Sequence, residues 1–588
     1  MKKPWLVMAS LAALGLSASL AQEAKPFVYP QAWTVAQPSE VRRGGTFRIS
    51  TISDYRTLNP FVTAEAENIP DRISAGGLVT RDPRNGEWIP YMAESFTIAP
   101  NRLSITFNIR RGMKWSDGRA ITADDWVTTW RIHTTEAVGS NSFDSFFLGD
   151  QPITVTKLGD YQLRINYPRT DAEALSVASF DPWPDHIFGP VFRARGADGI
   201  KAMWGLNTPA DQVVSSGPWK FASYRPGERL VMTRNPTFGE WNKDAAGGAL
   251  PYIDNFEVLI VRDINASLAA FLAGNIDSFT ASTVDHISQI RRAIQGNQLS
   301  ATIKVNASPS ASSQFIVWNW NRAADPFKQS LFRQAKFRQA MSHLVNRQAA
   351  VEVVFGGFGT PTFGSIYPAL AQWVNNAAPK FDFNPAQATK LLGEMGFTRK
   401  NAEGILVDRN GKALEFNLVT NSGNNIREQL ARLFVDEARK VGVKVNFQPI
   451  DFNVLVGQLQ ASKQADRPWD AILIGLSGGG LDWPFGPNVV KCDGGLHMYN
   501  TSGACIDPRE TQLDALYERG RQELDLQARR NLSNQMQVIE AQLQPVVYIA
   551  GPNFHPSWNN RIGGQYPDAL INSLYGSRVS VLSFVRGN

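Results

Sequence analysis

The chain has 588 residues, of which 43% are hydrophobic and 19% charged, which is too long for one hydrophobic core and too apolar for a disordered protein. Its formal net charge of +6 is small for this length, and no run of Lys and Arg follows one face. This pattern excludes a basic nucleic-acid-binding surface as the expected function. The 16 Trp residues stand out, because Trp serves both in cores and as a stacking platform for ligands.

Residues 1–21 have the three parts of a signal peptide. Lys2 and Lys3 form a positive start, residues 6–16 are apolar, and residues 19–21 are a small-x-small cleavage site. The apolar run is too short to span a bilayer, and no later segment reaches about 18 apolar residues. No Cys stands at the cleavage site for a lipid anchor. We therefore expect a periplasmic protein that is not membrane-embedded.

Residues 22–43 contain Pro and show no periodicity, which predicts an extended N-terminal arm. Further on, Thr122 with Asp125 three residues later predicts the capped start of a helix. Trp126 and Trp130 lie about one turn apart on that helix and share a face. We expect both rings in the core rather than in a ligand site.

The second half of the chain has an α/β pattern. Apolar residues alternate over residues 414–418 and 443–447, which predicts two strands, and an apolar stripe over residues 426–434 predicts a helix between them. A strand–helix–strand unit of this kind implies a parallel sheet. Residues 509–542 are predicted to be helical, and residues 545–551 to form the last strand.

The chain has two Cys residues, Cys492 and Cys505, which enclose one Gly-rich loop. Export makes a disulfide between them the favoured interpretation, with two separate thiols as the alternative. The six histidines never occur at the paired spacings of metal ligands, so neither a metal site nor another cofactor is expected; they are His133, His186, His286, His343, His497 and His555.

Several segments resemble one family and follow each other in family order. The most informative is residues 92–130, MAESFTIAPNRLSITFNIRRGMKWSDGRAITADDWVTTW. Others are residues 44–60, 77–95, 215–221, 233–238, 325–357 and 383–397. Together they are similar to the bacterial extracellular solute-binding proteins of the oligopeptide/dipeptide-binding family, family 5. Members of that family are the capture subunits of ABC importers.

The resemblance implies an α/β, periplasmic-binding-protein-like type II bilobal fold with a discontinuous first lobe, an inserted subdomain and a hinge. It also implies a monomer that delivers its solute to a membrane permease with separate ATPase subunits. The expected division is a signal peptide (1–21), an arm (22–43), the first lobe in three parts (44–75, 213–305 and 543–588), an inserted subdomain (76–212) and the second lobe (306–542).

One stretch that aligns with the family's ligand contacts is the strand that enters the second lobe. In a strand, Trp318 and Trp320 point to one face, and Asn319 and Asn321 to the other. One face therefore offers stacking surface and the other amide groups. One pair must belong to the core, and we expect one of the two Trp side chains to line the cleft.

A second stretch is residues 474–484, which includes Trp483. Peptide-binding members place an aspartate here that pairs with the α-amino group of the ligand. The alignment puts Gly479 at that position, so either Asp482 replaces the carboxylate or the ligand lacks an ammonium group. A third candidate is Asp54-Tyr55 in the loop after the first strand, with a solvated turn as the alternative reading. Trp183 of the inserted subdomain is a weaker candidate.

Two solutes fit these residues. Oligopeptides are the commoner ligands of the family and are the first expectation. Oligosaccharides are the alternative, because Gly479 carries no charge and Trp and Asn side chains are typical of sugar sites.

A secreted serine hydrolase is a distant alternative, since residues 475–479 fit G-x-S-x-G around Ser477, with Asp482 and either His497 or His555 downstream. The glycines and prolines that follow oppose the helix that such a site requires. The chain is therefore expected to be a receptor and not an enzyme, and it has no Walker A sequence of its own.

Overall fold

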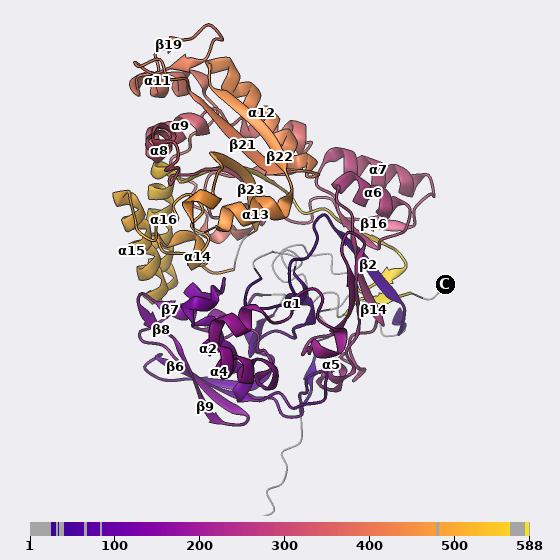
Figure 1. Ribbon diagram of the computed structural model, residues 1–588. Coiled ribbons are helices and arrows are strands. Elements are labelled where there is room, and N and C mark those ends of the chain that lie inside the picture. The colour runs from indigo at the N-terminus through magenta and orange to yellow at the C-terminus, as the bar shows by residue number, and fades with distance from the viewer. Residues whose placement is uncertain are drawn as a thin grey trace, which may run out of the picture.

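The computed structural model describes residues 25–30, 33, 40–63, 68–82, 85–461, 463–477, 481–564 and 582–586. The expected signal peptide, half of the expected arm and Gly479 lie outside the described residues. Figure 1 shows two lobes, one above the other, with the α/β second lobe at the top. Among the described residues, no helix has the length and apolarity needed to cross a membrane.

The second lobe is built on a six-stranded mixed sheet. Its strands, in spatial order, are β18 (Gly359–Pro361), β24 (Val546–Pro552), β17 (Ser312–Trp318), β23 (Ala471–Ser477), β21 (Glu415–Asn421) and β22 (Lys444–Ile450). The predicted parallel pair is confirmed, because β21 and β22 run parallel and are joined by α12 (Asn425–Val441). The predicted long helix is broken into α15 (Pro508–Gln522) and α16 (Leu526–Leu543).

One expected boundary is wrong. We placed residues 543–588 in the first lobe, but β24 pairs with β17 and β18 inside the sheet of the second lobe. The sequence of β24 is continuously apolar because both of its faces are covered, and that pattern does not reveal which sheet it joins.

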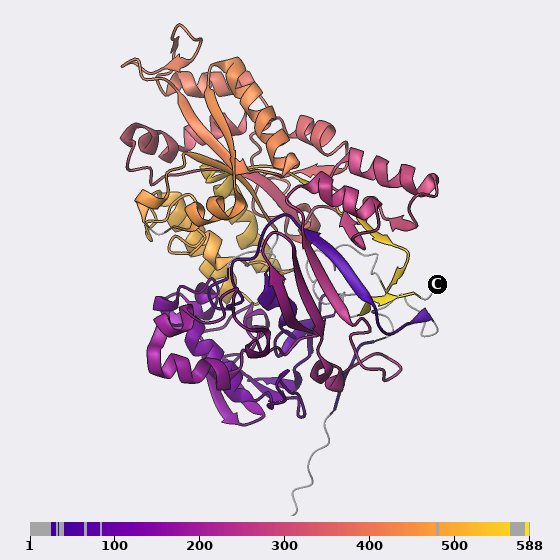
Figure 2. The same cartoon turned by 45° about the vertical axis from the view of Figure 1, so that its right-hand side comes forward.

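The first lobe has a four-stranded sheet whose order is β11 (Trp219–Arg225), β12 (Arg229–Arg234), β14 (Asn255–Ile260) and β2 (Thr46–Thr51). Figure 2 shows β2, from near the start of the chain, beside the much later strand β14, with which it pairs in parallel. A three-stranded sheet completes this lobe, in the order β15 (Ser278–Thr280), β25 (Pro556–Asn559) and β16 (Ala301–Ile303). Two helices lie beside it, α6 (Ile264–Leu272) and α7 (Val284–Gln295).

The chain crosses between the lobes twice, and the two crossings are paired. The Lys304 N–H donates to the Pro556 carbonyl (2.9 Å), the Ala307 N–H to the Phe554 carbonyl (3.0 Å) and the Phe554 N–H to the Ser308 carbonyl (3.0 Å). These bonds connect the pair β16–β25 of the first lobe to the pair β17–β24 of the second. A two-stranded ribbon therefore forms the hinge.

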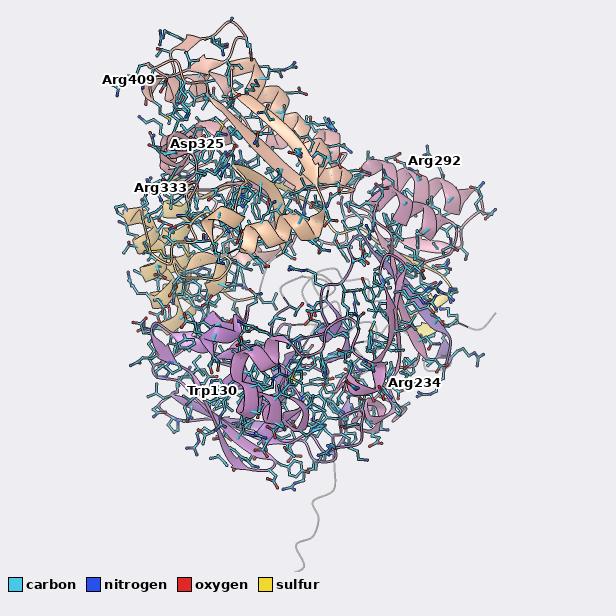
Figure 3. The ribbon with its side chains drawn as sticks, viewed as in Figure 1. Trp130, Arg234, Arg292, Asp325, Arg333 and Arg409 are labelled. Atoms are coloured by element: carbon cyan, nitrogen blue, oxygen red, sulfur yellow. A yellow bond between two sulfur atoms is a disulfide. The ribbon has the colours of Figure 1, made fainter. Side chains whose placement is uncertain are left out.

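An inserted subdomain packs below the second lobe. It contains the sheet β5 (Ala93–Ile98), β6 (Ser104–Ile109), β10 (Gln162–Asn166) and β9 (Thr154–Gly159), with helices α2 (Ala123–His133) and α4 (Asp185–Lys201). The predicted cap of α2 is confirmed, because the Thr122 N–H donates to the Asp125 carboxylate (2.8 Å). Trp126 is fully buried, and Trp130, labelled on α2 in Figure 3, donates its indole N–H to the Ile153 carbonyl (2.7 Å).

The predicted disulfide is confirmed, since Cys492 and Cys505 are bonded. It closes the loop between the short helix α14 (Pro487–Val490) and α15. His497 and Glu510 lie close to the Cys492 sulfur, but that sulfur is held in the disulfide and is not available as a metal ligand.

Candidate functional site

Trp318 and Trp320 both lie in the core of the second lobe, with no exposed surface. The Trp318 ring is surrounded by Phe337, Phe416 and Phe434, at centroid distances of 5.7, 6.1 and 6.5 Å. Our expectation that one of the two Trp residues lines the cleft is therefore wrong in this conformation. Helices cover the face of the strand to which Trp318 points, and alternation alone does not reveal that cover.

The two Asn side chains of the same stretch are structural as well. Asn319 is fully buried and donates through Nδ2 to the backbone carbonyls of Arg467 and Trp469, both at 3.2 Å. Asn321 accepts from the Thr501 N–H at 2.7 Å. Their amides satisfy buried backbone groups and tie the crossing strand to neighbouring loops.

In the second stretch, residues 474–484, Trp483 and Asp482 both make contacts within the protein. The Trp483 ring is buried between the Trp373 ring and α15, where a side chain on Gly520 would lie 2.3 Å from the indole. The Asp482 carboxylate accepts from the Arg81 guanidinium at 2.9 Å, which joins the second lobe to the inserted subdomain. In this conformation its charge is already neutralised, so it does not stand free for a solute ammonium.

Asp54 and Tyr55 hold the first lobe together. The Asp54 carboxylate accepts from the Tyr224 hydroxyl (2.7 Å), the Gly227 N–H (2.6 Å) and the Arg262 guanidinium (2.5 Å). Burial raises the pKa of Asp54, but these hydrogen bonds and the charge of Arg262 outweigh it and lower the pKa below its ordinary value. Tyr55 is buried against the Tyr224 ring, at a centroid distance of 5.7 Å.

Trp183 lies in the core of the inserted subdomain, 4% exposed, with its ring edge-on to Trp204. Trp183 is therefore a core residue in this conformation.

Ser477 is the exposed last residue of β23. A serine nucleophile needs a histidine within hydrogen-bond reach. The His497 Nε2 lies 3.1 Å from the Glu510 carboxylate, and the His555 Nε2 lies 3.2 Å from the Phe358 carbonyl. Both imidazoles are engaged with other groups, which removes the support that the sequence gave to a hydrolase.

A polar cluster that the sequence analysis missed lies at one end of the inner strands of the second-lobe sheet. Arg427, in the first turn of α12, donates through Nε to the Gln314 amide oxygen (2.8 Å) and through Nη1 to the Asn421 amide oxygen (2.7 Å). Gln314 lies directly over Gly475, where a side chain would lie 2.5 Å from its amide nitrogen. Three neighbouring strands thus supply one cluster.

The charge of Arg427 has no counter-ion among the described residues. Other buried arginines, such as Arg338, Arg347 and Arg467, donate to backbone carbonyl oxygens and so belong to the core. Arg427 instead bonds to two neutral side-chain amides, and burial lowers its pKa to about 10. The buried Nδ2 of Asn421 also lacks a partner among the described residues. Together with the positive end of α12, these donors favour an anion.

This cluster lies beside the contact of the two lobes at the hinge. The Asn425 amide donates to the Asp263 carboxylate of the first lobe (3.3 Å). Gly423 adopts a positive φ of +77°, and a side chain there would lie 2.2 Å from the Arg262 carbonyl. A side chain at position 423 therefore fits neither the backbone conformation nor the close approach of the lobes.

A second contact between the lobes lies away from the hinge, where α15 sits above the inserted subdomain at the left of Figure 1. We call it the seam and define it by Arg81, Asp171 and Glu173 of the subdomain and by Asp482 and Arg521 of the second lobe. Arg521 forms a bidentate ion pair with Asp171, and its Nε lies 3.0 Å from that carboxylate. Both side chains are almost fully buried.

Neighbouring contacts extend the seam. Arg169 pairs with Glu518, the Gly495 N–H donates to the Asp144 carboxylate (3.1 Å), and the Ala172 N–H donates to the Arg521 carbonyl (2.6 Å). The lobes are thus closed on each other at the hinge and at the seam. The start of β17 and the ends of β21 and β23, with Arg427, lie on the second-lobe side of this closure.

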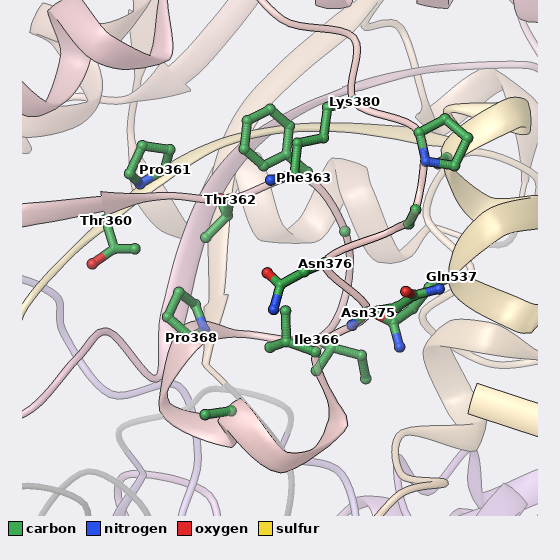
Figure 4. A pocket seen from close by; sticks show the side chains of 16 residues that line it. Thr360, Pro361, Thr362, Phe363, Ile366, Pro368, Asn375, Asn376, Lys380 and Gln537 are labelled. Carbon is green, nitrogen blue, oxygen red and sulfur yellow. The ribbon is translucent and has the colours of Figure 1, made fainter. Parts of the chain in front are cut away.

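A separate cavity of about 310 Å³ lies wholly within the second lobe. Figure 4 shows that it is lined by the segment from Thr360 to Lys380 and by Gln537 of α16. None of its lining residues comes from the first lobe, so closure does not form it.

Replacing Trp318 by Ala tests its place in the core. We expect the free energy of unfolding of the second lobe to fall by about 3–5 kcal/mol, because a large buried side chain is removed. Denaturant unfolding followed by circular dichroism measures this, with Phe383→Ala, a partly exposed aromatic of the same lobe, as control. Unchanged stability would show that Trp318 does not pack in the core.

Replacing Arg521 by Ala tests the seam. The change leaves Asp171 buried without its partner, which typically costs about 3–5 kcal/mol, so the closed arrangement should be lost and the radius of gyration should increase. Small-angle scattering measures this, with the exposed Arg519→Ala on the same helix as control. An equal effect of both substitutions, or of neither, contradicts a latch at the seam.

The comparisons with known proteins fit this geometry. The model of the bacterial extracellular solute-binding proteins, family 5 (middle region), matches residues 87–494. A probable ABC transporter-binding protein of Deinococcus radiodurans is 46% identical over 99% of both chains. The oligopeptide-binding protein AppA of Bacillus subtilis is 28% identical over 66% of this chain and 65% of its own length.

Solved structures share the fold. The AppA structure, in complex with a nonapeptide, has a TM-score of 0.77 at 22% identity and covers 93% of this chain and 100% of that one. The periplasmic binding protein MelB of Agrobacterium fabrum, in complex with stachyose, has a TM-score of 0.81 at 18% identity and covers 96% of this chain and 87% of that one. The expected type II bilobal fold is confirmed, and the chain belongs to the bacterial extracellular solute-binding proteins of family 5.

Proposed function

We propose that this protein is the periplasmic substrate-binding subunit of an ABC importer and that it captures oligopeptides between its two lobes. The observation that carries the proposal is Arg427, a half-buried cation without a counter-ion among the described residues. It lies at the ends of the inner strands of the second-lobe sheet, where the lobes meet. A peptide supplies the missing anion through its terminal carboxylate or an acidic side chain.

The choice of peptide over sugar rests on the same residues that first favoured sugar. Trp318, Trp320 and Trp483 are core residues, so none of them offers a stacking face in this conformation. An uncharged sugar also leaves the Arg427 charge without compensation. The family and the named ligand of AppA agree with a peptide.

An oligosaccharide is the second candidate, because Gly479 carries no carboxylate for a peptide ammonium and because MelB, which shares the fold, was solved with stachyose. In either case the role is capture and delivery. The solute stabilises the closed form, which a membrane permease with separate ATPase subunits then receives.

Native mass spectrometry of protein purified without refolding tests the solute class, because an enclosed solute survives purification. We expect additional masses that form a peptide ladder and disappear after unfolding and refolding. A series spaced by hexose units would contradict the peptide proposal and favour the sugar alternative.

Replacing Arg427 by Gln tests the anchor. Loss of a charge-assisted hydrogen bond of about 1.5–3 kcal/mol should weaken binding of a nonapeptide pool with free carboxyl ends roughly 10–150-fold. A second nonapeptide pool, with amidated ends and without acidic residues, should bind the variant and the wild type with equal affinity. Calorimetry measures both affinities.

The matched control is Arg432→Gln, which removes an exposed arginine from the same helix. An equal loss with both pools would show that Arg427 shapes the fold rather than binds the carboxylate. Weaker peptide binding by Arg432→Gln would show that any change in α12 lowers the affinity, and not the loss of Arg427 in particular.

A further inference from the structure

Glu173 belongs to the seam, but it takes no part in the ion pairs Arg81–Asp482 and Asp171–Arg521 that join the lobes. It lies between β10 and the short helix α3 (Ala174–Val177), and its backbone N–H donates to the Asp171 carboxylate at 3.0 Å. Its own carboxylate forms no ion pair with any described residue, although it is half-buried. The two other carboxylates of the seam are each held by an arginine.

The seam therefore holds three carboxylates and two guanidinium groups. The neighbouring Ala172 N–H donates to the Arg521 carbonyl at 2.6 Å, so Glu173 lies where the lobes meet. The charges of Asp171 and Arg81 in the first lobe and of Asp482 and Arg521 in the second act on its carboxylate, which also interacts with Tyr517 of the second lobe. With all acids ionised, these five groups carry one uncompensated negative charge at the contact of the lobes. Burial raises the pKa of Glu173 to about 8, the charges of Asp482 and Asp171 raise it further, and Arg81 and Arg521 oppose the rise.

Part of these surroundings exists only when the lobes are together, because Asp482, Arg521 and Tyr517 belong to the second lobe. In separated lobes Glu173 loses these second-lobe groups and the burial that they provide, so its pKa should fall back towards the ordinary value of a glutamic acid. We propose that closure of the lobes is coupled to the uptake of one proton by Glu173. The seam is then a pH-dependent latch that favours the closed receptor as the medium becomes more acidic.

The direction follows from the two protonation states. Below an ordinary glutamic acid pKa of 4.5 the acid is neutral in both forms, and closure carries no penalty. As the pH rises from there towards about 8, only the closed form keeps the proton. The equilibrium constant for closure should then fall about tenfold per pH unit, and it should level off above that window.

Glu173→Gln gives a neutral side chain of nearly the same shape, and it should keep the lobes closed at every pH. The matched control is Glu136→Gln, an exposed acid of the same subdomain. The first measurement is small-angle scattering of solute-free protein between pH 5 and pH 9. The radius of gyration of the wild type and of the control should grow with pH, while that of Glu173→Gln should stay small.

The second measurement is hydrogen exchange of α15, whose contacts with the subdomain the seam buries. The ratio of variant to wild-type exchange at each pH cancels the intrinsic pH dependence of the amides. We expect the ratio to fall by up to about tenfold per pH unit between pH 5 and pH 8, because only the wild type opens.

A wild type whose scattering and exchange do not change with pH relative to Glu173→Gln overturns the proposal. A Glu136→Gln control whose lobes also stay closed as the pH rises overturns it as well. The inference rests on the proposed function only in that closure accompanies solute capture, and both measurements use protein without solute. A failure of peptide binding is therefore distinguishable from a failure of the latch.

Discussion

The two-stranded ribbon that crosses between the lobes is the constraint on which the rest of the structure depends. Residues 301–318 run antiparallel to residues 546–559, from the pair β16–β25 in one lobe to the pair β17–β24 in the other. Because both crossings are hydrogen-bonded to each other, the lobes stay in register and rotate by bending this ribbon. The contacts between the lobes outside the ribbon, such as Asp171–Arg521, can then form or break with closure.

The seam opposes the ribbon across the closed molecule, and its chemistry suits a reversible contact. The burial of an ion pair such as Asp171–Arg521 costs desolvation of both groups, and their attraction roughly offsets that cost. Such a contact specifies how the lobes meet and adds little net stability while both partners are present, whereas the loss of one partner opposes closure. A bound solute then decides the equilibrium through its own interactions, and an unpaired cation such as Arg427 makes that contribution depend on the charge of the solute.

Local patterns predicted much of the fold, including the cap of α2, the parallel pair β21–β22 and the disulfide. They failed where long-range packing decides the outcome. The alternation around Trp318 shows which side chains share a face, but not that helices cover it. Arg427 escaped notice because Gln314, one of its two partners, comes from a strand distant in sequence, and a single Arg shortly after an Asn is ordinary without that third group.

The central claim is that the closed lobes enclose a peptide whose carboxylate meets Arg427. A crystal structure of the protein with its retained solute, or with a bound nonapeptide, tests this most directly. The account predicts continuous density between the two lobes, beside the strand ends of the second-lobe sheet, with a carboxylate at the guanidinium of Arg427. Density for a peptide on an outer surface, or a solute between the lobes that leaves Arg427 untouched, would contradict it.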